Sequence, residues 1–135
     1  MTGGVLVDSN VLLDIIEEDT TWFEWSSRNL QQMADRSILI INPVIYSELS
    51  VGFQQIEELE AALPPDMFER RPIPWEAAFL AGKCFVRYRR LGGVRRSPLP
   101  DFFIGAHAAV AGLTLLTRDA TRYRTYFPTI SMIDP

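Results

Sequence analysis

The sequence predicts a single α/β domain with a central, mostly parallel sheet flanked by helices. Short apolar runs, such as residues 5–7 and 38–41, alternate with longer helix-like stretches along the chain. This alternation is typical of parallel sheets covered by helices. The chain has 135 residues, of which 47% are apolar, and this suffices for one compact core. The sequence contains no repeat or linker, so one domain over residues 1–135 is the simplest interpretation.

Each predicted element has a local signal at its start or end. Ser9 or Asn10 can cap a helix, Pro43 and Pro100 suit first helical positions, and Gly112 is a helix-end signal. In chain order we expect a strand at 5–7, a helix from 9 or 10, a helix from 19–21 to 36, a strand at 38–41, a helix from 43, an exposed helical stretch at 54–63, an edge segment at 68–73, a helix at 75–91, a helix from 100 to about 111, a strand at 113–117, a short aromatic segment at 123–127 and a last edge strand at 129–133.

Charge is divided unevenly along the sequence. Of the 17 acidic residues, 13 lie before residue 70, whereas 11 of the 13 basic residues follow residue 69. Twelve of the basic residues are arginine, whose planar guanidinium matches phosphate well. The pattern favours a nucleic-acid partner, although a genome rich in arginine codons produces the same composition.

Four acidic residues at the ends or starts of predicted elements form the candidate site. Asp8 and Asp119 each follow a strand, Asp101 stands in the first turn of a proline-started helix, and Glu48 lies in the helix that Pro43 opens. Side chains that follow parallel strands meet at one edge of the sheet. Clustered carboxylates raise one another's pKa unless a cation balances them. Oxygen-only ligands select Mg²⁺ or Mn²⁺ over zinc, so the sequence predicts such a metal.

Other chemistries are poorly supplied. His107 is the only histidine and lies six residues after Asp101, on another side of the helix, so we expect a packed or surface residue and neither a Ser–His–Asp triad nor a zinc site. Asp14, six residues beyond Asp8, is expected to be a solvated or structural acid. No phosphate-binding glycine motif occurs. Metal-dependent hydrolysis is the chemistry that remains.

Membrane and secretion signals are also missing from the sequence. No apolar run approaches the roughly 20 residues that a membrane-spanning helix needs. The start, MTGGVLVDS, lacks a basic region followed by an apolar core, so we expect no secretion signal. The single cysteine, Cys84, is expected to be buried filler rather than a nucleophile. We therefore expect a cytoplasmic protein.

Four stretches of the chain resemble a known family. They are VLVDSNVLLD at 5–14, the helix around Glu48, LPDFFIGAHA at 99–108 and LLTRDATRY at 115–123. Together they resemble the motifs of PIN-domain ribonucleases, most closely the VapC-type toxins of type II toxin–antitoxin pairs. The resemblance implies that Asp8, Glu48, Asp101 and Asp119 are the metal-binding and catalytic acids. It also implies supporting roles for Ser9, Asn10 and Thr117.

The resemblance implies a Mg²⁺- or Mn²⁺-dependent endoribonuclease, in which a metal-activated water hydrolyses an RNA phosphodiester and leaves a 5′-phosphate and a 3′-hydroxyl. It further implies a homodimer and a VapB-type antitoxin that contacts Trp22 and Trp25 and inserts a basic side chain among the acids. Candidate phosphate contacts are Arg87, Arg89, Arg90, Arg95, Arg96 and Arg118. Two alternatives stay open: a catalytically silent PIN-like module that binds RNA or protein, and a DNA- or flap-directed nuclease on the same scaffold.

Overall fold

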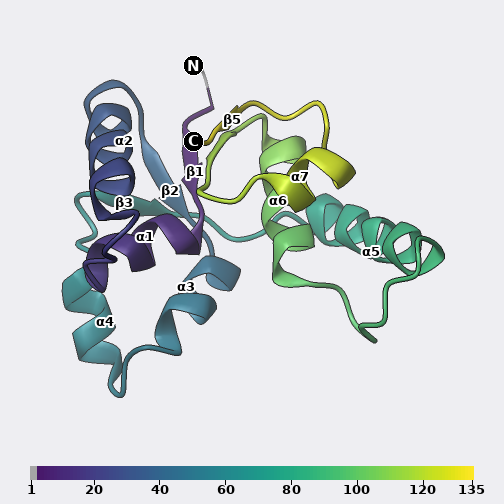
Figure 1. Ribbon diagram of the computed structural model, residues 1–135, viewed down its shortest axis with the longest axis horizontal. Coiled ribbons are helices and arrows are strands. Elements are labelled where there is room, and N and C mark those ends of the chain that lie inside the picture. The colour runs from purple at the N-terminus through teal and green to yellow at the C-terminus, as the bar shows by residue number, and fades with distance from the viewer. Residues whose placement is uncertain (1–2) are drawn as a thin grey trace.

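The computed structural model describes residues 3–135 and shows a parallel sheet between two groups of helices (Figure 1). Met1 and Thr2, which belong to the predicted domain and to the amino-terminal stretch, lie outside the described residues. The elements in chain order are β1 (Val5–Val7), α1 (Ser9–Ile16), α2 (Phe23–Arg36), β2 (Leu39–Ile41), α3 (Pro43–Ser50), α4 (Ile56–Ala62), β3 (Phe68–Arg70), α5 (Trp75–Arg90), α6 (Pro100–Ala111), β4 (Thr114–Leu116), α7 (Thr121–Tyr126) and β5 (Met132–Ile133).

The strands that follow β1 in the sequence are added first on one side of it and then on the other. Its order is β3-β2-β1-β4-β5, and all pairings among the described residues are parallel. The connections from β1 to β2 and from β2 to β3 extend the sheet one way, whereas the chain from β3 to β4 crosses back. Right-handed crossovers then place α1 to α4 opposite α5 to α7, as Figure 1 shows. The carboxyl ends of β1 and β4 therefore border the crevice at which such sheets bind ligands.

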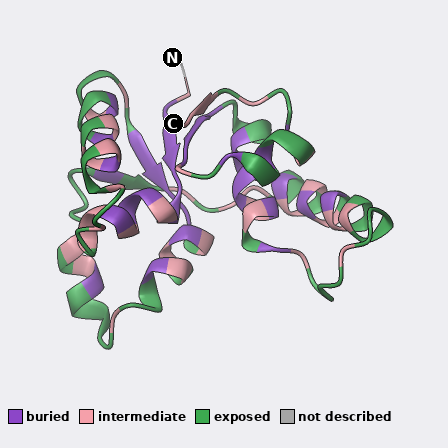
Figure 2. Cartoon of the chain, viewed as in Figure 1, coloured by how far each residue is buried: buried purple, intermediate pink, exposed green. Residues whose placement is uncertain are grey.

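The core is centred on β1, β2 and β4. All three strands are buried along their whole length, as Figure 2 shows. In the sheet, Leu6 pairs with Ile40 on one side and with Leu115 on the other. Apolar side chains from the helices on both faces pack against this centre. Within residues 3–135, no helix is both long and apolar enough to cross a membrane.

The predicted α/β class is confirmed, and several details differ from the prediction. The last strand covers Met132–Ile133 rather than 129–133, and the edge strand ends at Arg70 rather than at 73. The second helix begins at Phe23 rather than at 19–21. Asp19 Oδ2 accepts hydrogen bonds from the backbone N–H groups of Thr21 and Trp22, at 3.0 and 2.8 Å, and this turn delays the helix. The short aromatic segment after Asp119 forms the helix α7, which the sequence pattern did not predict.

Gly105, on α6, leaves little room for a side chain. A β-carbon there would lie 2.4 Å from two ring carbons of Phe127. We expect Gly105→Ala to lower the free energy of unfolding by about 1–3 kcal/mol, because the overpacking outweighs the gain in helix propensity.

Gly82→Ala on α5 is the matched control, because a β-carbon on Gly82 meets no atom within 4 Å. We expect this variant to be more stable than the wild type by about 0.5–1 kcal/mol. Urea unfolding of both variants measures the two effects. Equal stability of the two variants would contradict the tight contact between α6 and Phe127.

Candidate active site

Asp8 is the buried centre of the candidate site, with 3% of the residue exposed. It follows β1 directly, and its Oδ1 accepts a hydrogen bond from the Ser9 N–H at 2.8 Å, so the same side chain caps α1. Its Oδ2 accepts from the Thr117 hydroxyl at 2.9 Å and from the Tyr123 hydroxyl at 3.0 Å. Burial, reinforced by the nearby charges of Asp101 and Glu48, raises the pKa of Asp8 to about 6 despite these hydrogen bonds.

Glu48 reaches the same region from α3. The helix starts where Asn42 Oδ1 accepts from the Ile45 N–H at 2.9 Å. Glu48 is half-buried, and its Oε1 accepts from the Ser9 hydroxyl at 2.8 Å. Burial raises the pKa of Glu48, and the charge of Asp101 raises it further, while the Ser9 hydrogen bond opposes both. Ser9 therefore contacts both Asp8 and Glu48.

Asp101 enters from the opposite helical layer. It lies in the first turn of α6, directly after Pro100. Its Oδ1 is 3.3 Å from the Tyr123 hydroxyl, and its Oδ2 is 3.4 Å from Arg122 Nη1. Burial raises the pKa of Asp101, although the Arg122 charge acts in the other direction. Asp8, Glu48 and Asp101 thus come together from three elements.

Tyr123 was absent from the candidates that the sequence suggested. Its hydroxyl lies between Asp8 and Asp101, and the residue is buried. Burial and the charges of the two aspartates hold the pKa of Tyr123 well above its ordinary value. A phenol has one proton, so it cannot donate to both carboxylates at once. Its position on α7 depends on a helix that the sequence did not indicate, and Arg122 was missed for the same reason.

The loop after β4 holds the fourth acid at the rim of the site. Asn10 fixes this loop, since its Oδ1 accepts from the Arg118 N–H at 3.1 Å and its Nδ2 lies 3.3 Å from Thr117 Oγ1. Asp119 is exposed, and its Oδ1 accepts from the Thr121 N–H at 3.3 Å. Its charge contributes to the raised pKa of Asp101. Asp119 therefore acts on Asp101 from the edge of the site.

His107 joins α6 to the start of α3. It is buried, and its Nδ1 lies 3.0 Å from Asn42 Nδ2. Because Asn42 Oδ1 already accepts from Ile45, the amide NH₂ donates to His107, and this places the ring proton on Nε2. Burial lowers the pKa of His107. Of the two expected positions, packed or at the surface, His107 takes the packed one, and it helps to place Glu48 and Asp101 opposite each other.

Three of the candidate arginines bind groups within the chain. Arg118 Nε is 2.9 Å from Oδ2 of Asp14, which is buried and also accepts from the Ser26 hydroxyl at 2.7 Å. Asp14 is therefore structural rather than solvated. Arg87 Nη1 donates to the Thr125 carbonyl at 3.2 Å, and Arg89 Nη1 donates to a backbone carbonyl at 2.8 Å.

The remaining candidates are exposed or half-buried. Arg90, Arg95 and Arg96 are exposed, as are Arg87 and Arg89. Trp22 and Trp25 are half-buried, and their rings meet edge to face with centroids 6.1 Å apart. The guanidinium of Arg118 lies 5.7 Å from the centre of the Trp22 ring. Part of each indole therefore stays accessible to a partner.

The ligand atoms at the candidate site are of the type that hard divalent cations bind. Asp8, Glu48 and Asp101 offer only carboxylate oxygens, and burial together with the neighbouring carboxylates raises the pKa of Asp8. In residues 3–135, no three metal-ligating side chains are close enough to form a ready-made group.

The fold and the site define a parallel α/β domain whose acidic residues gather at the point where the sheet reverses. The chain belongs to the PIN domain family, whose model matches residues 5–128. None of the curated proteins matches the sequence.

Solved structures share the fold over nearly the whole chain. VapBC2 from Rickettsia felis, bound to a promoter DNA fragment, matches with a TM-score of 0.74, 17% identity and coverage of 97% of this chain and 98% of that one. DNA-bound VapBC from Salmonella typhimurium matches with a TM-score of 0.70, 19% identity and 97% coverage of both chains. A toxin–antitoxin complex from Klebsiella pneumoniae matches with a TM-score of 0.69, 20% identity and coverage of 96% and 95%.

Removal of the Tyr123 hydroxyl tests its place between the two aspartates. We expect Tyr123→Phe to lower the free energy of unfolding by about 1–3 kcal/mol near neutral pH, because a buried carboxylate loses a donor. The pKa of Asp8 should rise above about 6, since the Tyr123 hydrogen bond lowers it. Urea unfolding and NMR titration of the carboxyl carbon measure the two effects.

Tyr126→Phe is the matched control, because Tyr126 lies on the same helix and is half-buried against Phe102. We expect it to change stability by less than about 0.5 kcal/mol and to leave the pKa of Asp8 in place. Equal effects of the two substitutions would show that the Tyr123 hydroxyl does not bind the aspartates.

Proposed function

We propose that this chain is a Mg²⁺- or Mn²⁺-dependent endoribonuclease that acts as the toxin of a toxin–antitoxin pair. The observation that carries the proposal is the meeting of Asp8, Glu48 and Asp101, from three separate elements, at the carboxyl end of β1. Membership of the PIN domain family supports it. So does the resemblance of the fold to several toxin–antitoxin complexes.

In this proposal Asp8, Glu48 and Asp101 hold the ion, and Asp119 takes part from the rim. A bound divalent ion supplies charge stabilisation and lowers the pKa of a water. Ser9 orients Asp8 and Glu48 through its N–H and its hydroxyl. Thr117 and Asn10 keep the loop of Asp119 against Asp8.

The six candidate arginines are given different proposed roles according to the groups that each contacts within the chain. Exposed Arg90, Arg95 and Arg96 follow one another at the end of α5 and in the next loop, and they are proposed to contact phosphates. Arg87 and Arg89 remain proposed contacts at the same end of the helix. For Arg118 the ion pair with Asp14 supports a positioning role, because it ties the loop of Asp119 to α1.

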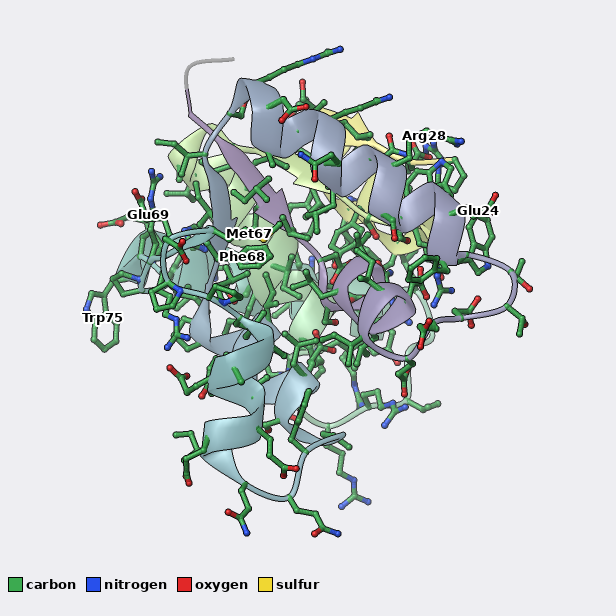
Figure 3. All side chains as sticks on the ribbon, turned by 90° about the vertical axis from the view of Figure 1, so that its left-hand side faces the viewer. Glu24, Arg28, Met67, Phe68, Glu69 and Trp75 are labelled. Carbon is green, nitrogen blue, oxygen red and sulfur yellow. The ribbon has the colours of Figure 1, made fainter. Side chains whose placement is uncertain are left out.

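We further propose an antitoxin as partner, with Trp22 and Trp25 as contacts, and a cytoplasmic location. The homodimer also stays a prediction. Trp75 and Phe79, one turn apart on α5, are 88% and 68% exposed, and Trp75 projects from the surface in Figure 3. Exposed apolar groups of this kind favour an interface between proteins.

Substitution of the central acids tests the proposed reaction. We expect Asp8→Asn and Asp101→Asn each to reduce Mg²⁺-dependent RNA cleavage at least about 100-fold and to relieve growth inhibition. Asp66→Asn, in an exposed loop, is the control and should cleave like the wild type. Gel analysis of matched RNA and DNA strands measures cleavage.

The same assay separates the alternatives. Unchanged RNA cleavage by the Asp8 and Asp101 variants would contradict the site. RNA binding by the wild type without any cleavage would favour a silent binding module. Preferential cleavage of the DNA strand would favour a DNA- or flap-directed nuclease.

Metal binding is expected to depend on pH through Asp8. The pKa of Asp8 is about 6 in the folded protein, above the ordinary 3.8. The stabilisation of the fold by protonated Asp8 is therefore complete below pH 3.8 and is lost as the pH rises through about 6. A cation requires the ionised carboxylate, so protons compete with it. We expect Mn²⁺ to raise the Tm more at about pH 7.5 than at about pH 5, with roughly tenfold weaker apparent affinity at the lower pH.

Differential scanning calorimetry with Mn²⁺ and with EDTA measures this shift without any nuclease assay. Asp101→Asn should remove most of the Mn²⁺ effect, while Asp66→Asn should keep it. A wild-type Tm that Mn²⁺ leaves unchanged at both pH values would show that the carboxylates do not bind the ion.

A further inference from the structure

A groove of about 500 Å³ adjoins the acidic residues between α5, α6 and α7. Asp101 and Asp119 belong both to the candidate site and to the groove wall. The remaining walls include Tyr88 from α5 and Arg122, Thr125 and Tyr126 from α7. A volume of this size suits a small organic group or one unit of a polymer. Any molecule in the groove therefore lies beside the acids.

One guanidinium group, that of Arg122, lines the groove, and a second, that of Arg87, contacts two residues of its wall. Arg122 lines it with a side chain that is 43% exposed, and its one ion pair, to Asp101, is long at 3.4 Å. Arg87 lies over the ring of Tyr126, 5.4 Å from its centre, and donates to the carbonyl of Thr125. Arg122 keeps further N–H donors for a ligand, because a guanidinium carries five. These cations favour an anionic ligand such as a phosphate.

The aromatic wall is held in place by the core. Tyr88 and Tyr126 both meet the buried ring of Phe102 edge to face, with centroids 5.7 and 5.0 Å away. Phe102 directly follows Asp101, so the rings have a fixed position relative to that acid. Aromatic side chains beside cations are the features with which proteins bind single-stranded nucleic acids.

We propose that this groove is a nucleotide subsite for single-stranded RNA. Arg122 and Arg87 contact a phosphate, Tyr88 and Tyr126 pack against the adjoining base, and the next phosphodiester along the strand lies beside Asp101 and Asp119. This inference rests on the proposed ribonuclease function and adds where the substrate lies. It assigns a binding role to Arg122, Tyr88 and Tyr126, none of which the sequence motifs indicated.

Fluorescence anisotropy with a labelled single-stranded RNA, in EDTA and at several salt concentrations, tests the phosphate contact. We expect Arg122→Gln to weaken binding about 5–10-fold and to reduce the slope of log affinity against log salt by about one. Arg124→Gln is the matched control, since Arg124 is exposed on the same helix and pairs with Asp134 rather than Asp101. Equal losses in the two variants, or no loss in either, would overturn the assignment of Arg122.

Two substitutions of one ring test the base contact. Tyr126→Leu should weaken RNA binding about tenfold because stacking is lost, and Tyr126→Phe, which keeps the ring, should weaken it much less. A 4-thiouridine RNA should crosslink to peptides that contain Tyr88 or Tyr126, as mass spectrometry shows. Crosslinks confined to other peptides would overturn the subsite.

The outcomes separate this inference from the proposed function. If the wild type cleaves RNA while Arg122→Gln and Tyr126→Leu bind it normally, the subsite is wrong and the ribonuclease proposal stands. If the wild type neither binds RNA in EDTA nor cleaves it with Mg²⁺, both fail.

Discussion

The burial of a single carboxylate, that of Asp8, is the constraint on which the candidate site depends. A charge removed from water is costly unless donors or a cation compensate it. Here the donors come from Ser9, Thr117 and Tyr123, which belong to α1, to the loop after β4 and to α7. These hydrogen bonds lower the free-energy cost of burying the carboxylate, and they also hold the three parts of the site together. They do not compensate it fully, since burial and the nearby acids still raise the pKa of Asp8 to about 6.

Sheet topology brings these groups within reach of one another. Val7 pairs with Leu116 in adjacent parallel strands, so the residues that follow them, Asp8 and Thr117, lie side by side. The helical acids need a separate connection, which the Asn42–His107 hydrogen bond supplies between α3 and α6. An uncharged histidine suits this role, because its Nδ1 must accept a hydrogen bond from the Asn42 amide.

Acidic and basic residues from different parts of the sequence pair with one another in the fold. Arg118, from the basic part of the chain, pairs with Asp14 from the acidic part, and Arg70 pairs with Glu60. The arginine content therefore serves internal pairing as well as any anionic ligand. Arg122 combines both features, since it pairs with Asp101 and also lines the groove. Two of the four acids, Asp101 and Asp119, belong to the wall of that groove.

The sequence by itself determined where the strands and most helices lie, and it placed four acids beside their ends, because each of these features depends on neighbours within a few residues. Pro100 starts α6 and places Asp101 in its first turn, and β1 ends at Val7, directly before Asp8, as predicted. Tertiary structure alone decided that Asp14 is buried, that residues 121–126 form a helix, and that Tyr123 lies between two aspartates. Tyr123 and Asp8 are 115 positions apart, and no local pattern records a contact over that separation. Such contacts arise only when the sheet order brings the ends of β1 and β4 together.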